Sequence, residues 1–108
     1  MSDIKEITEL LIKFRDERDW AKFHTAKDLA VALNIEAAEL LEAFLWKTSE
    51  QANLEQVKEE LADVIAYALL LAEKYDFDVR QMMVEKIERN AHKYPVAKSK
   101  GVAKKYTE

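Results

Sequence analysis

Apolar side chains recur every three to four residues along most of this chain, which is the period of an amphipathic α-helix. The pattern is clear from the start, where Ile4, Ile7, Leu11 and Phe14 share one face. It predicts four helices, over residues 3–17, 25–47, 54–75 and 79–92. A single Gly and a single Pro in 108 residues leave little material for tight turns. The predicted fold class is therefore all-α, a four-helix bundle.

Polar residues at the right spacing support the ends of these helices. Thr25 with Asp28, and Asp78 with Gln81, each have the spacing of a capping box at a helix start. Ser2 stands where the N-cap of the first helix is expected. Tyr94 and Pro95 then end the fourth helix, because the residue before a proline disfavours the helical conformation.

The third predicted helix is apolar on more than one side. Residues 64–72 are almost wholly apolar. Such a helix needs more than one neighbour to cover it. We therefore expect the chain to form a homo-oligomer, a dimer or a tetramer.

Two carboxylate pairs lie at the edge of the apolar stripes of the second and third predicted helices. Glu36 and Glu39 are three residues apart, as are Glu60 and Asp63, so each pair projects from one helix face. Carboxylates at such positions are costly unless they are paired or bound to a cation. Four oxygen ligands from two helices suit Mg²⁺ or Mn²⁺. The alternative is that both pairs belong to solvated helix faces of an acidic protein.

Charge is distributed unevenly along the chain. Residues 1–78 carry 9 Lys or Arg against 18 Asp or Glu, whereas residues 79–108 carry 8 against 3. We therefore predict a helical domain over residues 1–95 and a basic tail over residues 96–108, disordered by itself, in a chain that could bind a cation and an anion side by side. Stable nucleic-acid binding is not expected, because the acidic bulk of the chain would repel a phosphate backbone.

Several classes of chemistry and location are excluded at this point. The absence of Cys rules out disulfides, thiolate zinc sites and a cysteine nucleophile. The two histidines do not supply the Glu-x-x-His pairs of a di-iron bundle, and there is no Gly-rich phosphate loop. Apolar runs are too short for a membrane span, and the N-terminal residues do not resemble a signal peptide, so the cytoplasm is the expected location.

A short aromatic stretch separates the first two predicted helices. Trp20, Phe23 and His24 fall in a segment without a clear period. Two interpretations stay open. The aromatic rings cover the core, or they form a lid that stacks on a planar ligand.

Taken together, these motifs resemble the all-α nucleoside triphosphate pyrophosphohydrolases, the MazG-like group, and within it the dCTP pyrophosphatase branch. The resemblance covers nearly the whole chain. It rests on Arg18-Asp19-Trp20 with Phe23-His24, Glu36-x-x-Glu39, Phe44-x-Trp46-Lys47, Glu59-Glu60-Leu61-x-Asp63-Val64 with Tyr67, Lys86, Asn90, Lys93-Tyr94-Pro95 and Lys105-Tyr106-Thr107.

The resemblance implies a role for each matching residue and an assembly for the chain. The assembly is an intertwined dimer or a dimer of dimers. The metal-binding and catalytic residues would be Glu36, Glu39, Glu60 and Asp63, with Mg²⁺ or Mn²⁺ as the cofactor. Trp20 and Trp46 would sandwich the base, with His24 and Tyr67 in the same pocket. Phosphates would be held by Lys86, Asn90, Lys105 and Tyr106, in part from a neighbouring subunit.

The implied reaction is hydrolysis of a nucleoside triphosphate, dCTP or a related deoxynucleotide, to the monophosphate and pyrophosphate. A bound cation would lower the pKa of water, and either Glu39 or Glu42 would orient or deprotonate that water. Two alternatives stay open. One is a non-catalytic helical interaction module. The other is a related pyrophosphatase for another nucleotide, such as phosphoribosyl-ATP or dUTP.

Overall fold

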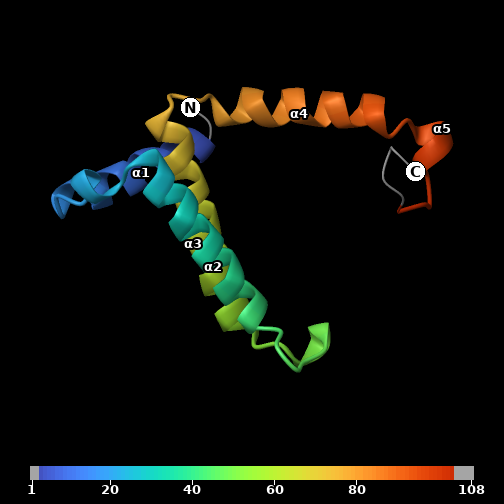
Figure 1. Cartoon of the computed structure of the whole chain (residues 1–108), viewed down its shortest axis with the longest axis horizontal. Helices are drawn as coiled ribbons and strands as arrows, with labels where there is room; N and C mark the ends of the chain where they lie inside the picture. Colours follow the sequence, from blue (N-terminus) through green and yellow to red (C-terminus); the bar gives the residue numbers. More distant parts are fainter. Residues whose placement is uncertain (1–2, 104–108) are drawn as a thin grey trace. The chain divides into compact units, whose positions relative to one another are not determined.

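A computed structural model of the chain describes residues 3–103 (Figure 1). These residues form helices and connecting turns without a β-strand, so the predicted all-α class is confirmed. The α-helices are α1 (Asp3–Glu17), α2 (Ala26–Glu42), α3 (Leu54–Lys74), α4 (Val79–Lys93) and α5 (Val96–Ser99). Two short 3-10 helices, η1 (Ala21–Phe23) and η2 (Ser49–Gln51), lie in the connections on either side of α2.

Side-chain caps fix where the helices begin. Thr25 Oγ1 accepts a hydrogen bond from the Asp28 amide at 3.1 Å, and Asp78 Oδ1 accepts one from the Gln81 amide at 3.0 Å. Both predicted N-caps are therefore confirmed. They satisfy amide groups that would otherwise lack a partner in the first turn of the helix. Ser2, the N-cap predicted for α1, lies outside the described residues.

The predicted end of the second helix is wrong. We expected it near Trp46 and Lys47, but α2 ends at Glu42. The chain then tightens, because the amides of Phe44 and Leu45 donate to carbonyl groups three residues earlier rather than four. Trp46 follows with a φ of 60°, a left-handed conformation that cannot continue a helix.

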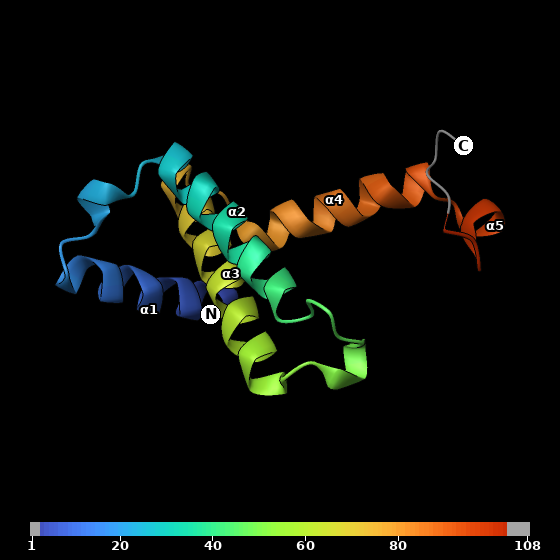
Figure 2. The same cartoon turned by 60° about the horizontal axis from the view of Figure 1, so that its bottom comes forward.

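The described chain divides into two compact units between Phe77 and Asp78, and each is considered by itself. In the first unit, α2 and α3 run antiparallel and side by side, as both views show (Figures 1 and 2), and α1 packs against α3. The core of this unit is small. Its buried apolar residues are Leu29, Ala43, Ala52, Leu69, Leu70 and Ala72.

Several large apolar residues of α2 and α3 are exposed rather than buried. Leu41 on α2 is 68% exposed, and Leu61 on α3 is 45% exposed. The reason is that α2 and α3 cover each other only on one side, and α1 covers only a further part of α3. Within residues 3–103, no helix combines the length and the apolar character needed to cross a membrane.

The second unit, beginning at Asp78, also leaves apolar side chains uncovered. Met82, Met83 and Ile87 on α4 are 38–61% exposed, because little besides the short α5 belongs to this unit. The helix α5 itself is a correction, since no regular structure was expected in the tail. The division into a domain over residues 1–95 and a tail over residues 96–108 stays a prediction.

Candidate metal centre and adjoining cleft

Three of the four predicted metal-binding carboxylates meet in space. Glu36 of α2 and Glu60 and Asp63 of α3 each offer an oxygen atom, and these atoms lie within 4.8 Å of one another. We call this group the acidic cluster. The antiparallel pairing of α2 with α3 brings the two faces together, and the three-residue spacing aligns Glu60 with Asp63. Glu39 does not belong to the cluster, but its carboxylate lies close enough to affect the pKa of Glu36 and of Glu60.

The acidic cluster is electrostatically unfavourable without a cation. Burial raises the pKa of Glu36 to about 7, and the nearby carboxyl groups of Glu39, Asp63 and Glu60 add to this effect. The pKa of Glu60 is raised as well, first by burial and then by the charge of Glu39. Close carboxylates repel each other, so each disfavours the charged form of its neighbour.

The donor atoms of the cluster fit a hard divalent cation. The Oε2 atoms of Glu36 and Glu60 are buried and have no hydrogen-bond partner within the part of the chain that the structure describes. A buried acceptor without a partner is costly. Carboxylate oxygens are also the ligands that Mg²⁺ and Mn²⁺ prefer. A cation held by Glu36, Glu60 and Asp63 would satisfy both orphaned oxygens.

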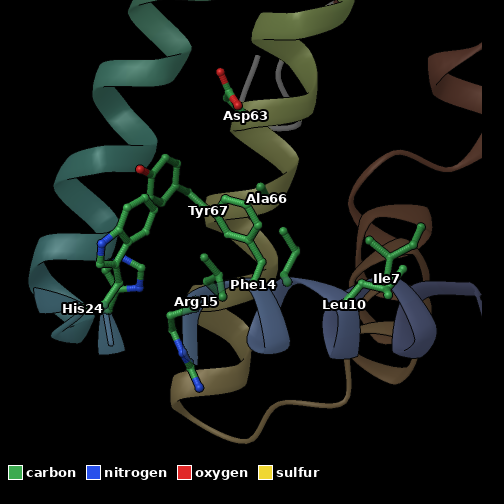
Figure 3. A pocket seen from close by; sticks show the side chains of 11 residues that line it. Ile7, Leu10, Phe14, Arg15, His24, Asp63, Ala66 and Tyr67 are labelled. Carbon is green, nitrogen blue, oxygen red and sulfur yellow. The ribbon is translucent and has the colours of Figure 1, made fainter. Parts of the chain in front are cut away.

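A cleft of about 510 Å³ adjoins the acidic cluster and shares Asp63 with it (Figure 3). Asp63 lies at one end of this cleft and Arg15 at the other, with Tyr67 between them. One wall is apolar and comes mainly from α1, with Ile7, Leu10, Leu11 and Phe14. The polar lining consists of Arg15, Trp20, His24, Asp63 and Tyr67.

The aromatic stretch before α2 is docked on α1. The ring of Trp20 packs edge-to-face on Phe14, with 5.8 Å between the ring centroids and an interplanar angle of 73°. Trp20 is nevertheless 44% exposed and lines the cleft. The ring of Trp20 thus covers part of α1 and still has an exposed surface. These two features fit, respectively, the interpretation that the rings cover the core and the interpretation that they stack on a planar ligand.

Arg15 and His24 lie at the end of the cleft away from Asp63 (Figure 3). The pKa of His24 is lowered by burial and by the charges of Arg15 and Lys74, so the imidazole is neutral at pH 7. Arg15 donates from Nε to Asp16 at 2.9 Å and from Nη1 to Glu73 on α3 at 3.1 Å.

Sequence reasoning missed Arg15. Its guanidinium points away from Asp63 (Figure 3). The hydrogen bond from Arg15 to Glu73 links α1 to α3 beside the cleft. One feature of the sequence could have identified Arg15. It lies four residues after Leu11, so a charged side chain falls on the apolar stripe of the first helix.

The structure does not bring the two tryptophans together within one chain. Trp20 precedes α2 and Trp46 follows it, and a 17-residue helix separates them by about 25 Å. Trp46 is 94% exposed and does not line the cleft. The base sandwich therefore stays a prediction, and one that a single chain cannot satisfy.

Two of the four predicted phosphate-binding residues, Lys86 and Asn90, belong to the second unit. Lys86 and Asn90 are exposed on α4, four residues apart and hence on one helix face. Lys105 and Tyr106 lie outside the described residues. The roles proposed for all four residues stay predictions.

Comparisons with known proteins show the family to which the chain belongs. The model of the MazG-like family matches residues 31–108. The chain is 35% identical to mouse dCTP pyrophosphatase 1 over 113 residues, which span 97% of this chain and 66% of the mouse protein. Human dCTP pyrophosphatase 1 is 33% identical over the same share of each chain. This chain thus spans about two thirds of the length of these mammalian relatives.

A solved structure is also similar over most of its length. The crystal structure of a pyrophosphatase from Archaeoglobus fulgidus superposes with a TM-score of 0.80 at 39% sequence identity, covering 88% of this chain and 94% of the archaeal one. The resemblance drawn from the motifs is thereby confirmed. The homologues include pyrophosphatases, and the chain belongs to the MazG-like family.

Proposed function

We propose that the chain is a metal-dependent nucleoside triphosphate pyrophosphohydrolase, which converts dCTP or a related deoxynucleotide to the monophosphate and pyrophosphate. The observation that carries this proposal is the sharing of Asp63 between the acidic cluster and the cleft. A cation site and a cavity wide enough for a base are contiguous. Membership of the MazG-like family and the similarity to dCTP pyrophosphatases support it.

The acidic cluster serves the phosphates in this proposal. Glu36, Glu60 and Asp63 would hold Mg²⁺ or Mn²⁺, which when bound would offset phosphate charge and make water more acidic. Glu39, whose carboxylate lies beside those of Glu36 and Glu60, would orient or deprotonate the attacking water, and Glu42 is the alternative. Water attacks the α-phosphorus, the bond to the bridging oxygen breaks, and pyrophosphate leaves.

The cleft serves the nucleoside. Its apolar wall on α1 removes a base from water, and the open face of Trp20 offers a ring on which the base stacks. The triphosphate then extends past Tyr67 toward Asp63. A nucleotide bound in this direction presents its phosphates to the acidic cluster and its base to the end that contains His24.

A second copy of the chain completes the site in this proposal. Apolar residues on α2, α3 and α4 are exposed, including Leu41, Ile65 and Ile87, and α4 carries Lys86 and Asn90 on one face. Because α2 keeps Trp20 and Trp46 of one chain apart, a base can be sandwiched only between Trp20 of one copy and Trp46 of another. The assembly is therefore a homo-oligomer with composite sites.

The test is pyrophosphate release from a panel of deoxynucleoside and nucleoside triphosphates, each assayed with Mg²⁺ and with EDTA. We expect release with Mg²⁺ that is strongest on dCTP or its analogues and absent with EDTA. Release that is strongest on another base would keep the reaction and change the substrate. No release from any nucleotide, by a folded protein that binds Mg²⁺, would refute the proposal and favour an interaction module.

A further inference from the structure

The helix α1 ends in a Schellman motif, a pair of backbone hydrogen bonds that turns the chain off the helix axis. The amide of Trp20 donates to the carbonyl oxygen of Arg15 at 3.1 Å. The amide of Asp19 donates to the carbonyl oxygen of Asp16, also at 3.1 Å. Asp19 adopts a left-handed conformation, with a φ of 55°. The direction in which the chain leaves α1 is therefore set at Asp19.

The residue type at position 19 matters through the backbone. Glycine usually occupies the left-handed position of a Schellman motif, and Asp and Asn tolerate it better than other residues with a side chain. The carboxylate of Asp19 is 80% exposed and pairs with Lys22 at 3.0 Å. Such an exposed ion pair contributes little to stability. What Asp19 contributes is the left-handed turn.

This turn places the ring of Trp20 on Phe14. The two ring centroids are 5.8 Å apart, and both residues line the cleft. An apolar contact of this kind, between the residue after the left-handed position and the last turn of the helix, often accompanies a Schellman motif. If α1 instead continued to residue 20, Trp20 would lie about 120° around the helix axis from Phe14. The contact thus depends on the conformation of Asp19.

We propose that Asp19 is a positioning residue, whose left-handed conformation holds the ring of Trp20 against Phe14 at the cleft and thereby sets the affinity for the nucleotide. This inference rests on the proposed function, in which the base stacks on Trp20, and deepens it. Asp19 itself does not line the cleft and does not belong to the acidic cluster. Substitutions of Asp19 should therefore change KM and leave kcat and the response to Mg²⁺ nearly unchanged.

The substitutions separate the backbone conformation of Asp19 from its charge. D19N and D19G remove the carboxylate, and both Asn and Gly adopt the left-handed conformation readily. D19A disfavours that conformation, and D19V does so more strongly because Val is β-branched. K22A removes the other partner of the ion pair and leaves the turn intact.

A second Schellman motif in the same unit provides a matched control. At the end of α3, the amide of Phe77 donates to the carbonyl oxygen of Ala72 at 2.9 Å, and Asp76 has a φ of 57°. Phe77 does not line the cleft. D76A therefore disfavours the same backbone conformation without moving a ring of the cleft.

The first measurement is KM and kcat for dCTP with Mg²⁺. D19A should raise KM about fivefold, and D19V more, because the state that presents Trp20 becomes less populated. D19N, D19G and K22A should keep KM within about twofold of the unmodified protein. Increases in D19N and D19G as large as in D19A would assign the effect to the charge and overturn the inference, as would an unchanged KM in D19A and a folded D19V.

A double-mutant cycle tests whether Asp19 acts through Trp20. In a W20A background, D19A should cause no further rise in KM, because the ring that it displaces is already absent. Effects of W20A and D19A that multiply independently would mean that Asp19 does not act through this ring, and they would overturn the inference.

The position of the ring can also be followed without a substrate. The chain has two tryptophans, so in W46F the fluorescence comes from Trp20 alone. Quenching by acrylamide should increase when D19A is added to W46F, and it should not change when D19N or D76A is added. Equal quenching with and without D19A would overturn the inference.

Calorimetry with dCMP separates this inference from the proposed function. If the unmodified protein bound dCMP but released no pyrophosphate from any nucleotide, the proposed function would fail, and the dissociation constant for dCMP would take the place of KM. Weaker binding of dCMP in D19A than in D19N supports the role of the turn. Equal binding in these two variants overturns it.

Discussion

The acidic cluster and the cleft share Asp63, yet the chain builds them in different ways. The cluster needs only the α2–α3 pair, whose helical spacing sets the position of each carboxylate. The cleft needs α1 and the Trp20–His24 stretch to dock on that pair. The cluster can therefore lose its chemistry while the fold persists, whereas the cleft depends in addition on the docking of α1. Substitutions in one region should affect metal response and turnover, and those in the other should affect nucleotide affinity.

The largest effect should come from the cluster. D63N or E60Q removes one ligand charge and should lower pyrophosphate release by at least about a hundredfold, because a cluster short of one ligand holds the cation poorly. The helices should persist, since no contact that supports the fold is lost. Circular dichroism and a pyrophosphate assay measure the two properties. E55Q, in the exposed first turn of α3, is the matched control, and full activity in D63N would show that the metal assignment is wrong.

The tryptophans provide the next test, because they should alter affinity and leave the cluster intact. Base–aromatic stacking contributes about 1–3 kcal/mol per base, so W20A and W46A should each raise KM for dCTP about tenfold or more. Mg²⁺ binding should be unchanged in both variants. An unaltered KM in W46A would mean that this residue does not touch the base.

Co-expression of W20A with W46A tests whether the sandwich forms between copies. Mixed oligomers would contain some sites with both rings intact, so part of the affinity for dCTP should return. The 17 residues of α2 prevent the two rings of one chain from meeting. If the mixture behaved as the average of the two pure variants, Trp46 would not act across the interface, and the composite site would be refuted.

Metal binding should also be visible in stability without any substrate. The pKa of Glu36 in the folded protein, about 7, lies above the ordinary value of 4.5. Between these two pH values the folded state binds more protons than the unfolded state, so the metal-free protein loses stability as the pH rises from 4.5 to 7. Above pH 7 the cluster is charged, and Mg²⁺ relieves the repulsion. At 100 times its dissociation constant, a ligand adds about 2.7 kcal/mol. Mg²⁺ should therefore raise Tm by several degrees at pH 8 and by less at pH 6, where it competes with protons.

The E36Q variant sharpens this expectation. It removes a charge that is unfavourable without metal, so its Tm in EDTA at pH 8 should exceed that of the unmodified protein. Its response to Mg²⁺ should be reduced. Scanning calorimetry at pH 6 and pH 8 provides both values. A Mg²⁺ shift that is equal at the two pH values would disagree with a cluster that binds protons near neutrality.

The acidic cluster and the cleft also differ in how far each could be predicted from the sequence. The proximity of Glu36, Glu60 and Asp63 was predicted because spacing within a helix is local, and the caps at Thr25 and Asp78 were predicted for the same reason. The cleft was not, because it exists only once α1 has docked. The early end of α2 depends on a tightened turn and on the left-handed conformation of Trp46, which apolar periodicity does not encode.

The smallest expected effect concerns Arg15, whose bond to Glu73 links α1 to α3 beside the cleft. The Arg15 side chain is 12% exposed and that of Glu73 is 33% exposed, so the pair is partly screened, and its coupling energy should be about 1 kcal/mol. A double-mutant cycle with R15M and E73Q, followed by denaturant unfolding, measures this energy.

The kinetic consequence of breaking this pair distinguishes the two regions of the site. Looser docking of α1 should raise KM for dCTP a few-fold, because the apolar wall of the cleft moves, and should leave the Mg²⁺-induced change in Tm unaltered. K22A removes the exposed ion pair with Asp19, at 3.0 Å, and should change neither property. If R15M weakened the Mg²⁺ response as much as nucleotide affinity, the cluster would also depend on α1, and the independence of the two regions would not hold.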